Sequence, residues 1–116
     1  MILRVFILFV LITISCNKEE ALQICNTENP VNNLKWLADF IEKVKSDPKY
    51  VSVTISVFEY QDQTVFNIYD VIQSCLYCDL RNCSGQKYTP TDFSDFAASK
   101  KDVKKIWCQN PDLCVN

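Results

Sequence analysis

The sequence predicts an α+β domain, in which one helix packs on an antiparallel sheet of three to four strands, with a short second helix and disulfide bonds as staples. Three observations predict this class. Apolar residues recur at spacings of three and four between residues 34 and 44, which is typical of a helix with one buried face. From residue 51 onward apolar and polar residues alternate, as they do in strands, and six cysteines follow residue 24.

The chain begins with an apolar leader, and we expect residues 1–15 to be a signal peptide. Arg4 supplies one positive charge, and the run from Val5 to Ile14 is apolar except for Thr13. A run of about 10 apolar residues suits a secretory signal and is too short for the roughly 20 that span a bilayer.

Cys16 stands where the leader ends, and we expect it to carry a lipid. Ile14, Ser15 and Cys16 resemble a bacterial lipobox, although Thr13 replaces the leucine usual three positions before the cysteine. Seven cysteines are an odd number, and assigning Cys16 to the lipid leaves the even set that disulfides require. That set is Cys25, Cys75, Cys78, Cys83, Cys108 and Cys114. The alternative is plain secretion with cleavage after Ser15.

The charged run behind Cys16 predicts where the protein is sent. Lys18, Glu19 and Glu20 resemble the export signal of Bacteroidetes-type surface lipoproteins. The resemblance implies an outer-membrane protein that touches the membrane through its lipid anchor only and faces the cell exterior; the periplasmic face is the alternative. The same residues suit a solvated spacer, so residues 16–29 are expected to be the lipidated N-terminus and tether.

Composition excludes several function classes. About 100 residues remain after the leader, enough for a single small domain, which we expect over residues 30–116. The net charge of −2 argues against nucleic acid as a partner, and the lysines between residues 100 and 105 are expected to form a solvated face. The chain has no histidine, which excludes imidazole-based triads and most catalytic zinc sites, so we expect no cofactor and no metal.

Two helices are expected. The first begins at Asn32 or Asn33, whose short polar side chains can cap a helix, and it ends at Pro48. Its inward stripe comprises Leu34, Leu37, Ile41 and Val44, widened by Trp36 and Phe40. The second helix runs from Pro90 to about residue 99 with Thr89 as its cap. Its inward residues are Phe93, Phe96 and Ala97.

Strands are expected between these helices. Residues 50–60 form the first, with Phe58 and Tyr60 covering its second face. Its first face comprises Val51, Val53, Ile55 and Val57. Residues 61–63 are a polar turn, and residues 64–71 return as the second strand of an antiparallel hairpin. Residues 74–79 and 86–88 are expected as third and fourth strands, and the apolar cluster of Val103, Ile106 and Trp107 suits either a helix or a strand.

Four short segments resemble small Bacteroidetes-type outer-membrane lipoproteins of unknown function. The segments are residues 29–37, residues 60–66, Leu76-Tyr77 and Ile106-Trp107. The family pattern is an Asn-Pro-Leu start, a Trp-Leu helix and a Tyr-x-Gly-Gln-x-Val-Phe hairpin; here Asp62 replaces the turn glycine, and cysteines are more numerous. The resemblance implies the membrane address and the fold, and it transfers no active site.

The sharpest chemical pattern is Cys75-Leu76-Tyr77-Cys78, followed by Cys83. A redox interpretation makes Cys75 a nucleophile and Cys78 its resolving partner, and a zinc interpretation adds Cys83 and a fourth thiolate. An exported protein meets oxidising conditions, which favour disulfides instead. Six thiols permit 15 pairings. Closeness in the sequence favours Cys108–Cys114 and Cys78–Cys83, which leaves Cys25–Cys75.

The sequence identifies no ligand and no catalytic residue. Its leading interpretation is a non-catalytic binding or interaction domain whose partner, a protein or a small ligand, is unknown. One alternative is an inhibitor of a hydrolase, because small helix-and-sheet domains often present hairpin loops to enzyme clefts. The other is a thiol–disulfide oxidoreductase that uses Cys75 and Cys78.

Overall fold

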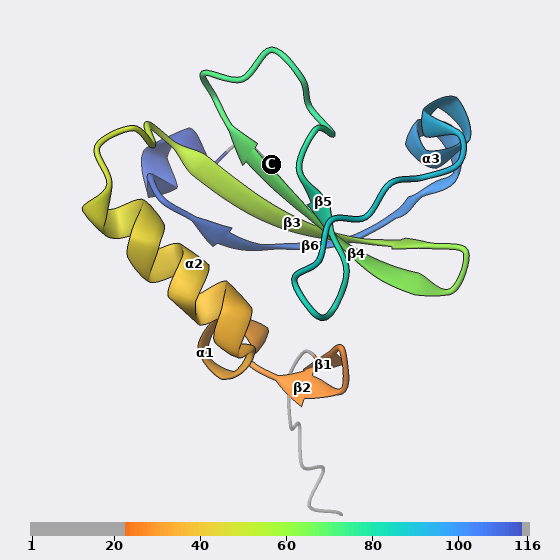
Figure 1. The fold of residues 1–116 in the computed structure, drawn as a ribbon, viewed down its shortest axis with the longest axis horizontal. Helices are drawn as coiled ribbons and strands as arrows, with labels where there is room; N and C mark the ends of the chain where they lie inside the picture. Colours follow the sequence, from red (N-terminus) through yellow and green to blue (C-terminus); the bar gives the residue numbers. More distant parts are fainter. Residues whose placement is uncertain (1–22, 115–116) are drawn as a thin grey trace, which may run out of the picture.

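A four-stranded antiparallel sheet forms the centre of the molecule, as the computed structural model shows for residues 23–114 (Figure 1). Its strands lie in the order β5-β4-β3-β6, and a separate small sheet contains β1 and β2. The elements are β1 (Gln23–Ile24), β2 (Thr27–Glu28), α1 (Pro30–Asn33), α2 (Lys35–Ser46), β3 (Val53–Tyr60), β4 (Gln63–Asp70), β5 (Leu80–Arg81), α3 (Phe93–Ser99), β6 (Lys101–Cys108) and a final 3₁₀ turn (Pro111–Leu113). The predicted α+β class is confirmed.

The folded part begins earlier than the sequence predicts. β1 and β2 pair as a short hairpin around Cys25 and Asn26, whose φ angles are 58° and 56°. Ile24 is buried in the same core as the inward stripe of α2. Residues 23–28 are therefore packed on the domain, which corrects the tether expected over residues 16–29 for this part of it. The rest of that tether lies outside the described residues.

The first helix is interrupted at Leu34. α1 begins at Pro30, because proline at the first helical position already has the required φ angle. Leu34 is extended (φ −84°, ψ 110°), and α2 then runs to Ser46, just before the expected stop at Pro48. Capping by Asn32 or Asn33 is wrong, since Asn33 lies at the end of α1 and its side-chain amide donates to the carbonyl of Glu28.

The stripe predicted for the first helix is the centre of the main core. Leu37, Ile41 and Val44 are buried, and Leu34, Trp36 and Phe40 are half-buried against them. They pack on one face of the β3–β4 hairpin, which consists of Val53, Ile55, Val57, Phe66 and Ile68. Val51 is 54% exposed and does not join this face, because it precedes β3.

β3 and β4 form the predicted hairpin and pair along their whole length. Its two turn residues, Gln61 and Asp62, have φ angles of 50° and 59°, as the twist of a tight hairpin turn requires. The opposite face of the hairpin carries a second, smaller core, as the aromatic residues of the first strand predict. Its buried members are Phe58, Tyr60, Val65, Leu80 and Phe96, and Tyr77 and Tyr88 pack against them.

The third strand expected at residues 74–79 is wrong. These residues belong to a loop, residues 71–79, and β5 contains only Leu80 and Arg81. The Cα atoms of Cys75 and Cys78 are 5.5 Å apart in a disulfide. An extended chain would separate them by about 10 Å, so this bridge is incompatible with a strand. The fourth strand expected at residues 86–88 is reduced to a single bridge between Lys87 and Arg81.

The second helix starts later than expected. Asp92, not Thr89, is its cap, and its carboxylate accepts hydrogen bonds from the backbone amides of Ser94 and Asp95. α3 therefore begins at Phe93, which stands in the first turn of a helix of only 7 residues whose one buried residue is Phe96. Phe96 is buried as predicted. Phe93 and Ala97 are exposed, so their inward placement is wrong.

The apolar cluster near the C-terminus belongs to strand β6, which pairs with β3 and fills the other edge of the sheet. Ile106 and Trp107 pack against the main core, whereas Val103 is 43% exposed. Lys101, Lys104 and Lys105 are exposed, which confirms the solvated face for these lysines. Lys100 is the exception, because its side chain is only 12% exposed.

Candidate functional site

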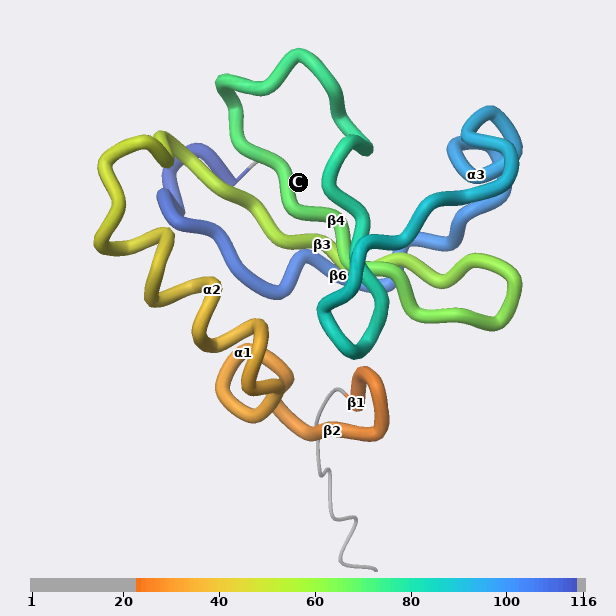
Figure 2. Tube along the Cα trace, viewed as in Figure 1, coloured from red at the N-terminus to blue at the C-terminus, as the bar shows by residue number. Residues whose placement is uncertain are grey.

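Three disulfide bonds join the six predicted cysteines. Cys108–Cys114 is confirmed. The pairs Cys78–Cys83 and Cys25–Cys75 are wrong, because Cys25 bonds to Cys83 and Cys75 bonds to Cys78. The zinc interpretation loses its ligands, since all three of its named cysteines are in disulfides. Figure 2 shows why Cys25 reaches Cys83: the β1–β2 hairpin lies next to the turn at residues 82–86.

The 71–79 loop is fixed at its start by Asp70. Asp70 is 4% exposed, and its carboxylate accepts hydrogen bonds from the backbone amides of Val51, Ser52 and Ile72 at 2.9, 3.0 and 3.4 Å. Burial acts to raise the pKa of Asp70, but the hydrogen bonds from backbone amides outweigh it and hold the pKa below its ordinary 3.8. The loop therefore leaves β4 from a defined position.

Tyr77 fixes the middle of the 71–79 loop. Its ring packs edge-to-face on Phe58 and Phe96, with centroid distances of 6.0 and 5.5 Å. The Lys100 ammonium lies 5.4 Å from the Tyr77 ring and 4.6 Å from the Phe58 ring. Burial acts to lower the pKa of Lys100, but the Tyr77 hydroxyl and the Asp102 carboxylate outweigh it and raise the pKa above 10.5. Lys100 stays charged and closes this aromatic cluster.

The segment at residues 87–89 is positioned by the turn before it. The indole NH of Trp36 donates to the carbonyl of Cys83 at 2.8 Å, and the Trp36 ring packs against Gly85. The Tyr88 amide donates to the Leu80 carbonyl at 2.8 Å. The Cys25–Cys83 disulfide holds the same turn at the same residue. Lys87 and Tyr88 therefore emerge from a fixed support.

Phe93 is held in place by the first turn of α3. The Asp92 cap fixes the start of that turn, and the Tyr60 hydroxyl donates a short hydrogen bond to the Asp95 carboxylate. This bond, together with burial, raises the pKa of Tyr60 to about 12. The turn of the β3–β4 hairpin and α3 are thereby joined, and Phe93 is left 50% exposed.

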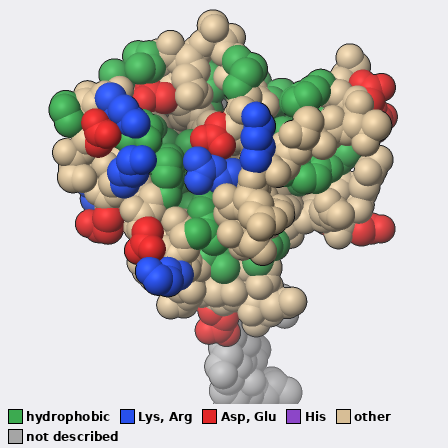
Figure 3. Space-filling view, in the orientation of Figure 1, with side chains coloured by type: hydrophobic (Ala, Val, Ile, Leu, Met, Phe, Trp, Pro, Cys, Tyr) green, Lys and Arg blue, Asp and Glu red, His purple; other side chains and the backbone are tan. Residues whose placement is uncertain are grey.

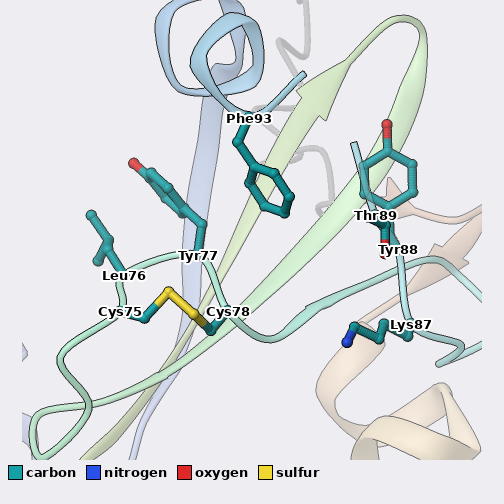
Figure 4. A pocket seen from close by; sticks show the side chains of 8 residues that line it. All are labelled: Cys75, Leu76, Tyr77, Cys78, Lys87, Tyr88, Thr89 and Phe93. Carbon is teal, nitrogen blue, oxygen red and sulfur yellow. A yellow bond between two sulfur atoms is a disulfide. The ribbon is translucent and has the colours of Figure 1, made fainter. Parts of the chain in front are cut away.

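These three segments line an open hollow of about 570 Å³ (Figure 4). Its lining residues are Cys75, Leu76, Tyr77, Cys78, Lys87, Tyr88, Thr89 and Phe93. Leu76 and Phe93 at the rim are 51% and 50% exposed. In the close-up the Cys75–Cys78 disulfide lies at one side of the hollow and Lys87 projects its amine from the other. In the space-filling view, hydrophobic side chains reach the surface between the 71–79 loop and α3 (Figure 3).

The sequence identified one wall of this hollow and missed the others. The Cys75-Leu76-Tyr77-Cys78 pattern marked the first wall. Lys87 and Tyr88 were assigned to a strand, and Phe93 to the core. The signal that locates Phe93 is Asp92, since an aspartate two residues before Ser94 caps a helix at least as well as Thr89 does.

The candidate residues near the N-terminus, Cys16, Lys18, Glu19 and Glu20, lie outside the described residues. Within residues 23–114 no group of three or more histidine, cysteine, aspartate or glutamate residues is placed to hold a metal ion. None of the helices in that range is both long and apolar enough to cross a membrane. Comparisons of the chain with family models, with curated proteins and with solved structures found no match.

Proposed function

We propose that this chain is a non-catalytic binding protein whose hollow takes up an apolar segment of a partner protein. The observation that carries the proposal is the hollow itself, with half-exposed Leu76 and Phe93 at its rim. Its volume of about 570 Å³ lies in the range of protein ligand pockets. Large apolar side chains gathered at one place on a surface mark interaction sites more often than side chains scattered singly do.

The rigidity of the walls supports binding. Tyr77 is packed on two aromatic rings, the 82–86 turn is held by a disulfide and by Trp36, and α3 is joined to the β3–β4 hairpin through Tyr60. When a partner enters a preformed site, the protein that provides the site loses little conformational freedom. More of the free energy of the contacts therefore remains as affinity.

The oxidoreductase alternative is less well supported by this geometry. Cys75 and Cys78 lie in a loop between β4 and β5, and neither starts a helix. A helix N-terminus is the usual device that lowers the pKa of a reactive cysteine in such a motif. Labelling of protein taken from the cell envelope with a thiol reagent tests the alternative. Free thiols at Cys75 and Cys78 would favour a redox enzyme, whereas complete protection favours a structural bridge.

The hydrolase-inhibitor alternative has one specific observation in its favour. The 71–79 loop stands out from the sheet, and Ile72 and Leu76 on it are 63% and 51% exposed (Figure 1). A disulfide-closed apolar loop can enter an enzyme cleft. The test is whether the purified protein inhibits secreted proteases and whether substitution of Leu76 abolishes the inhibition. That result would mean that the loop enters an enzyme cleft, and not that a partner enters the hollow.

A matched pair of variants tests the binding proposal. Leu76 and Leu113 are 51% and 47% exposed, and each lies inside a loop closed by a disulfide, Cys75–Cys78 or Cys108–Cys114. Peptides selected from a random library on the wild-type protein should bind Leu76→Ser about tenfold more weakly, since burial of a leucine contributes about 1.5–3 kcal/mol and part of this one is already buried. Leu113→Ser should bind them as the wild type does. Equal loss in both variants would refute the hollow as the site.

The lipid anchor and the outer-membrane address belong to the same proposal, because a binding protein at the cell surface meets its partner there. Cys16→Ser should release the protein from the membrane fraction or stall its processing, and wild type should incorporate labelled fatty acid. Replacement of Lys18, Glu19 and Glu20 by alanine should keep the protein membrane-bound but protect it from protease added to intact cells. Equal surface digestion of both forms would refute the assignment of Lys18, Glu19 and Glu20 as an export signal.

A further inference from the structure

The hollow has one charged side chain in its lining, and that charge is positive. Lys87 is the only lysine or arginine among the eight lining residues, and none of the eight is acidic. Its amine projects into the hollow from the wall opposite the disulfide (Figure 4). Within residues 23–114 the Lys87 ammonium forms no ion pair. A ligand that fills the hollow meets an unneutralised cation next to apolar walls.

The charged groups nearest to Lys87 have hydrogen-bond or ion-pair partners of their own. Arg81, the nearest cation along β5, is paired with Asp79 at 3.0 Å. Asp92, which adjoins the lining, already accepts hydrogen bonds from two backbone amides at the start of α3. An apolar ligand that covered Lys87 would remove water from the ammonium group without replacing it. A carboxylate on the ligand would restore the lost interaction.

We propose that the bound segment carries a large apolar residue directly followed by an acidic one, so that the apolar side chain enters the hollow and the carboxylate meets Lys87. This inference rests on the proposed function, because it names the partner chemistry of the same hollow. The apolar side chain would contact Leu76, Tyr77 and Phe93, and the carboxylate would lie at the Lys87 wall.

An internal acidic side chain fits better than the free C-terminus of a chain. Sites for a terminal carboxylate use several free backbone amides arranged as a nest. Beside Lys87 these amides are already engaged: the amide of Gly85 donates to the Asn82 carbonyl, that of Gln86 to the Asn82 side chain, and that of Tyr88 to the Leu80 carbonyl. The half-exposed rim also leaves room for a chain to continue beyond the hollow.

The test uses the processed wild-type protein and four short peptides, three of them with both ends blocked. Three probes carry a central phenylalanine followed by glutamate, glutamine or lysine, and a fourth ends in phenylalanine with a free carboxylate. Binding is followed by NMR titration of the backbone amides at 50 mM and at 500 mM salt. The variants are Lys87→Gln and, as a matched control, Lys104→Gln, since Lys104 is an exposed lysine on β6 that does not line the hollow.

The glutamate peptide should bind wild type about 2–5-fold more tightly than the glutamine peptide at low salt, which is the range for an exposed ion pair. The lysine peptide should bind more weakly than either. The preference should vanish at 500 mM salt and in Lys87→Gln, and it should persist in Lys104→Gln.

Each contrary result has a separate meaning. Equal affinity for the three internal probes, or a preference that survives in Lys87→Gln, would overturn the acidic partner while leaving an apolar binding site. Tighter binding of the free-terminus probe would overturn the choice of a side-chain carboxylate. If no probe shifts the amides of the lining residues, the hollow is not a binding site, and the proposed function fails with it.

Discussion

Replacement of Gly85, the only glycine in the chain, by alanine should destabilise the domain and displace one wall of the hollow. Gly85 has a φ angle of +79°, and a Cβ atom added there would lie 2.6 Å from two atoms of the Trp36 ring. The ring cannot easily retreat, because it packs edge-to-face on Phe66 at 5.1 Å and its indole NH donates to the Cys83 carbonyl. Both backbone strain and steric overlap therefore oppose the substitution.

The magnitude follows from three terms. A left-handed backbone costs a residue with a Cβ atom about 1–2 kcal/mol. Overpacking against a rigid neighbour costs about 1–3 kcal/mol. Reduced freedom of the unfolded chain offsets about 0.4–1 kcal/mol. The net loss in free energy of unfolding should be about 1–5 kcal/mol, and its midpoint of about 3 kcal/mol corresponds to a decrease in Tm of about 12–24 °C for a domain of this size.

Chemical denaturation of four variants separates strain from overlap. Ser84 is the preceding residue, and its side chain is exposed. The free energy of unfolding of Ser84→Ala should therefore stay within about 0.5 kcal/mol of the wild-type value. In a Trp36→Leu background, Gly85→Ala should cost only the backbone strain less the unfolded-chain offset, about 0–1.6 kcal/mol. An equal cost in both backgrounds would refute the steric argument. A cost near zero in the wild-type background would refute the conformation of the whole 82–86 turn.

Two further predictions concern stability. The pKa of Asp70 is lowered in the folded state, so its stabilisation is complete above the ordinary value of 3.8 and is lost as pH falls below it. Asp70→Asn should therefore lower Tm at pH 7 and reduce the loss of Tm on acidification between about pH 5 and pH 2, by comparison with wild type in thermal melts. The double substitution of Cys25 and Cys83 by serine should cost about 4 kcal/mol in denaturant titrations, because this bridge closes a loop with a sequence separation of 58. A cost below about 1 kcal/mol would contradict Cys25–Cys83 as a major constraint on the unfolded chain.

Local sequence patterns predicted the helices and strands whose packing partners lie nearby in the chain. The stripe of Leu37, Ile41 and Val44 identified α2, and the alternation from Val53 to Val57 identified β3, because each pattern reports which face meets the core. The β3–β4 turn was found because its strands follow each other directly. The partner of β3 on its other edge, β6, starts at Lys101, more than forty residues later in the chain, and no local pattern reports such a pairing.

Errors in the predicted strands and pairings have a common physical cause. Residues 74–79 have the side chains of a strand, but the Cys75–Cys78 bond shortens the backbone below what a strand allows. Closeness in sequence favoured Cys78–Cys83, yet Cys83 packs against the main core beside Cys25 and Trp36, whereas Tyr77, next to Cys78, packs against the second core. Covalent and tertiary contacts outweighed propensity at both places, which is why the walls of the hollow were predicted least well.

Each of the three supports of the hollow has contacts of its own, and all three meet in one aromatic cluster, where Tyr77 packs on Phe96 of α3 and Tyr88 packs against the same core. The 71–79 loop depends on Asp70 and on the packing of Tyr77; the segment with Lys87 depends on Trp36, Gly85 and the Cys25–Cys83 bond; Phe93 depends on the Asp92 cap. If Leu76 and Phe93 served only the core, they would turn inward and release water. Each is instead about half exposed in the lining of the hollow. Such an arrangement is expected where the exposed side chains serve a partner, and it favours binding over a purely structural role for the 71–79 loop.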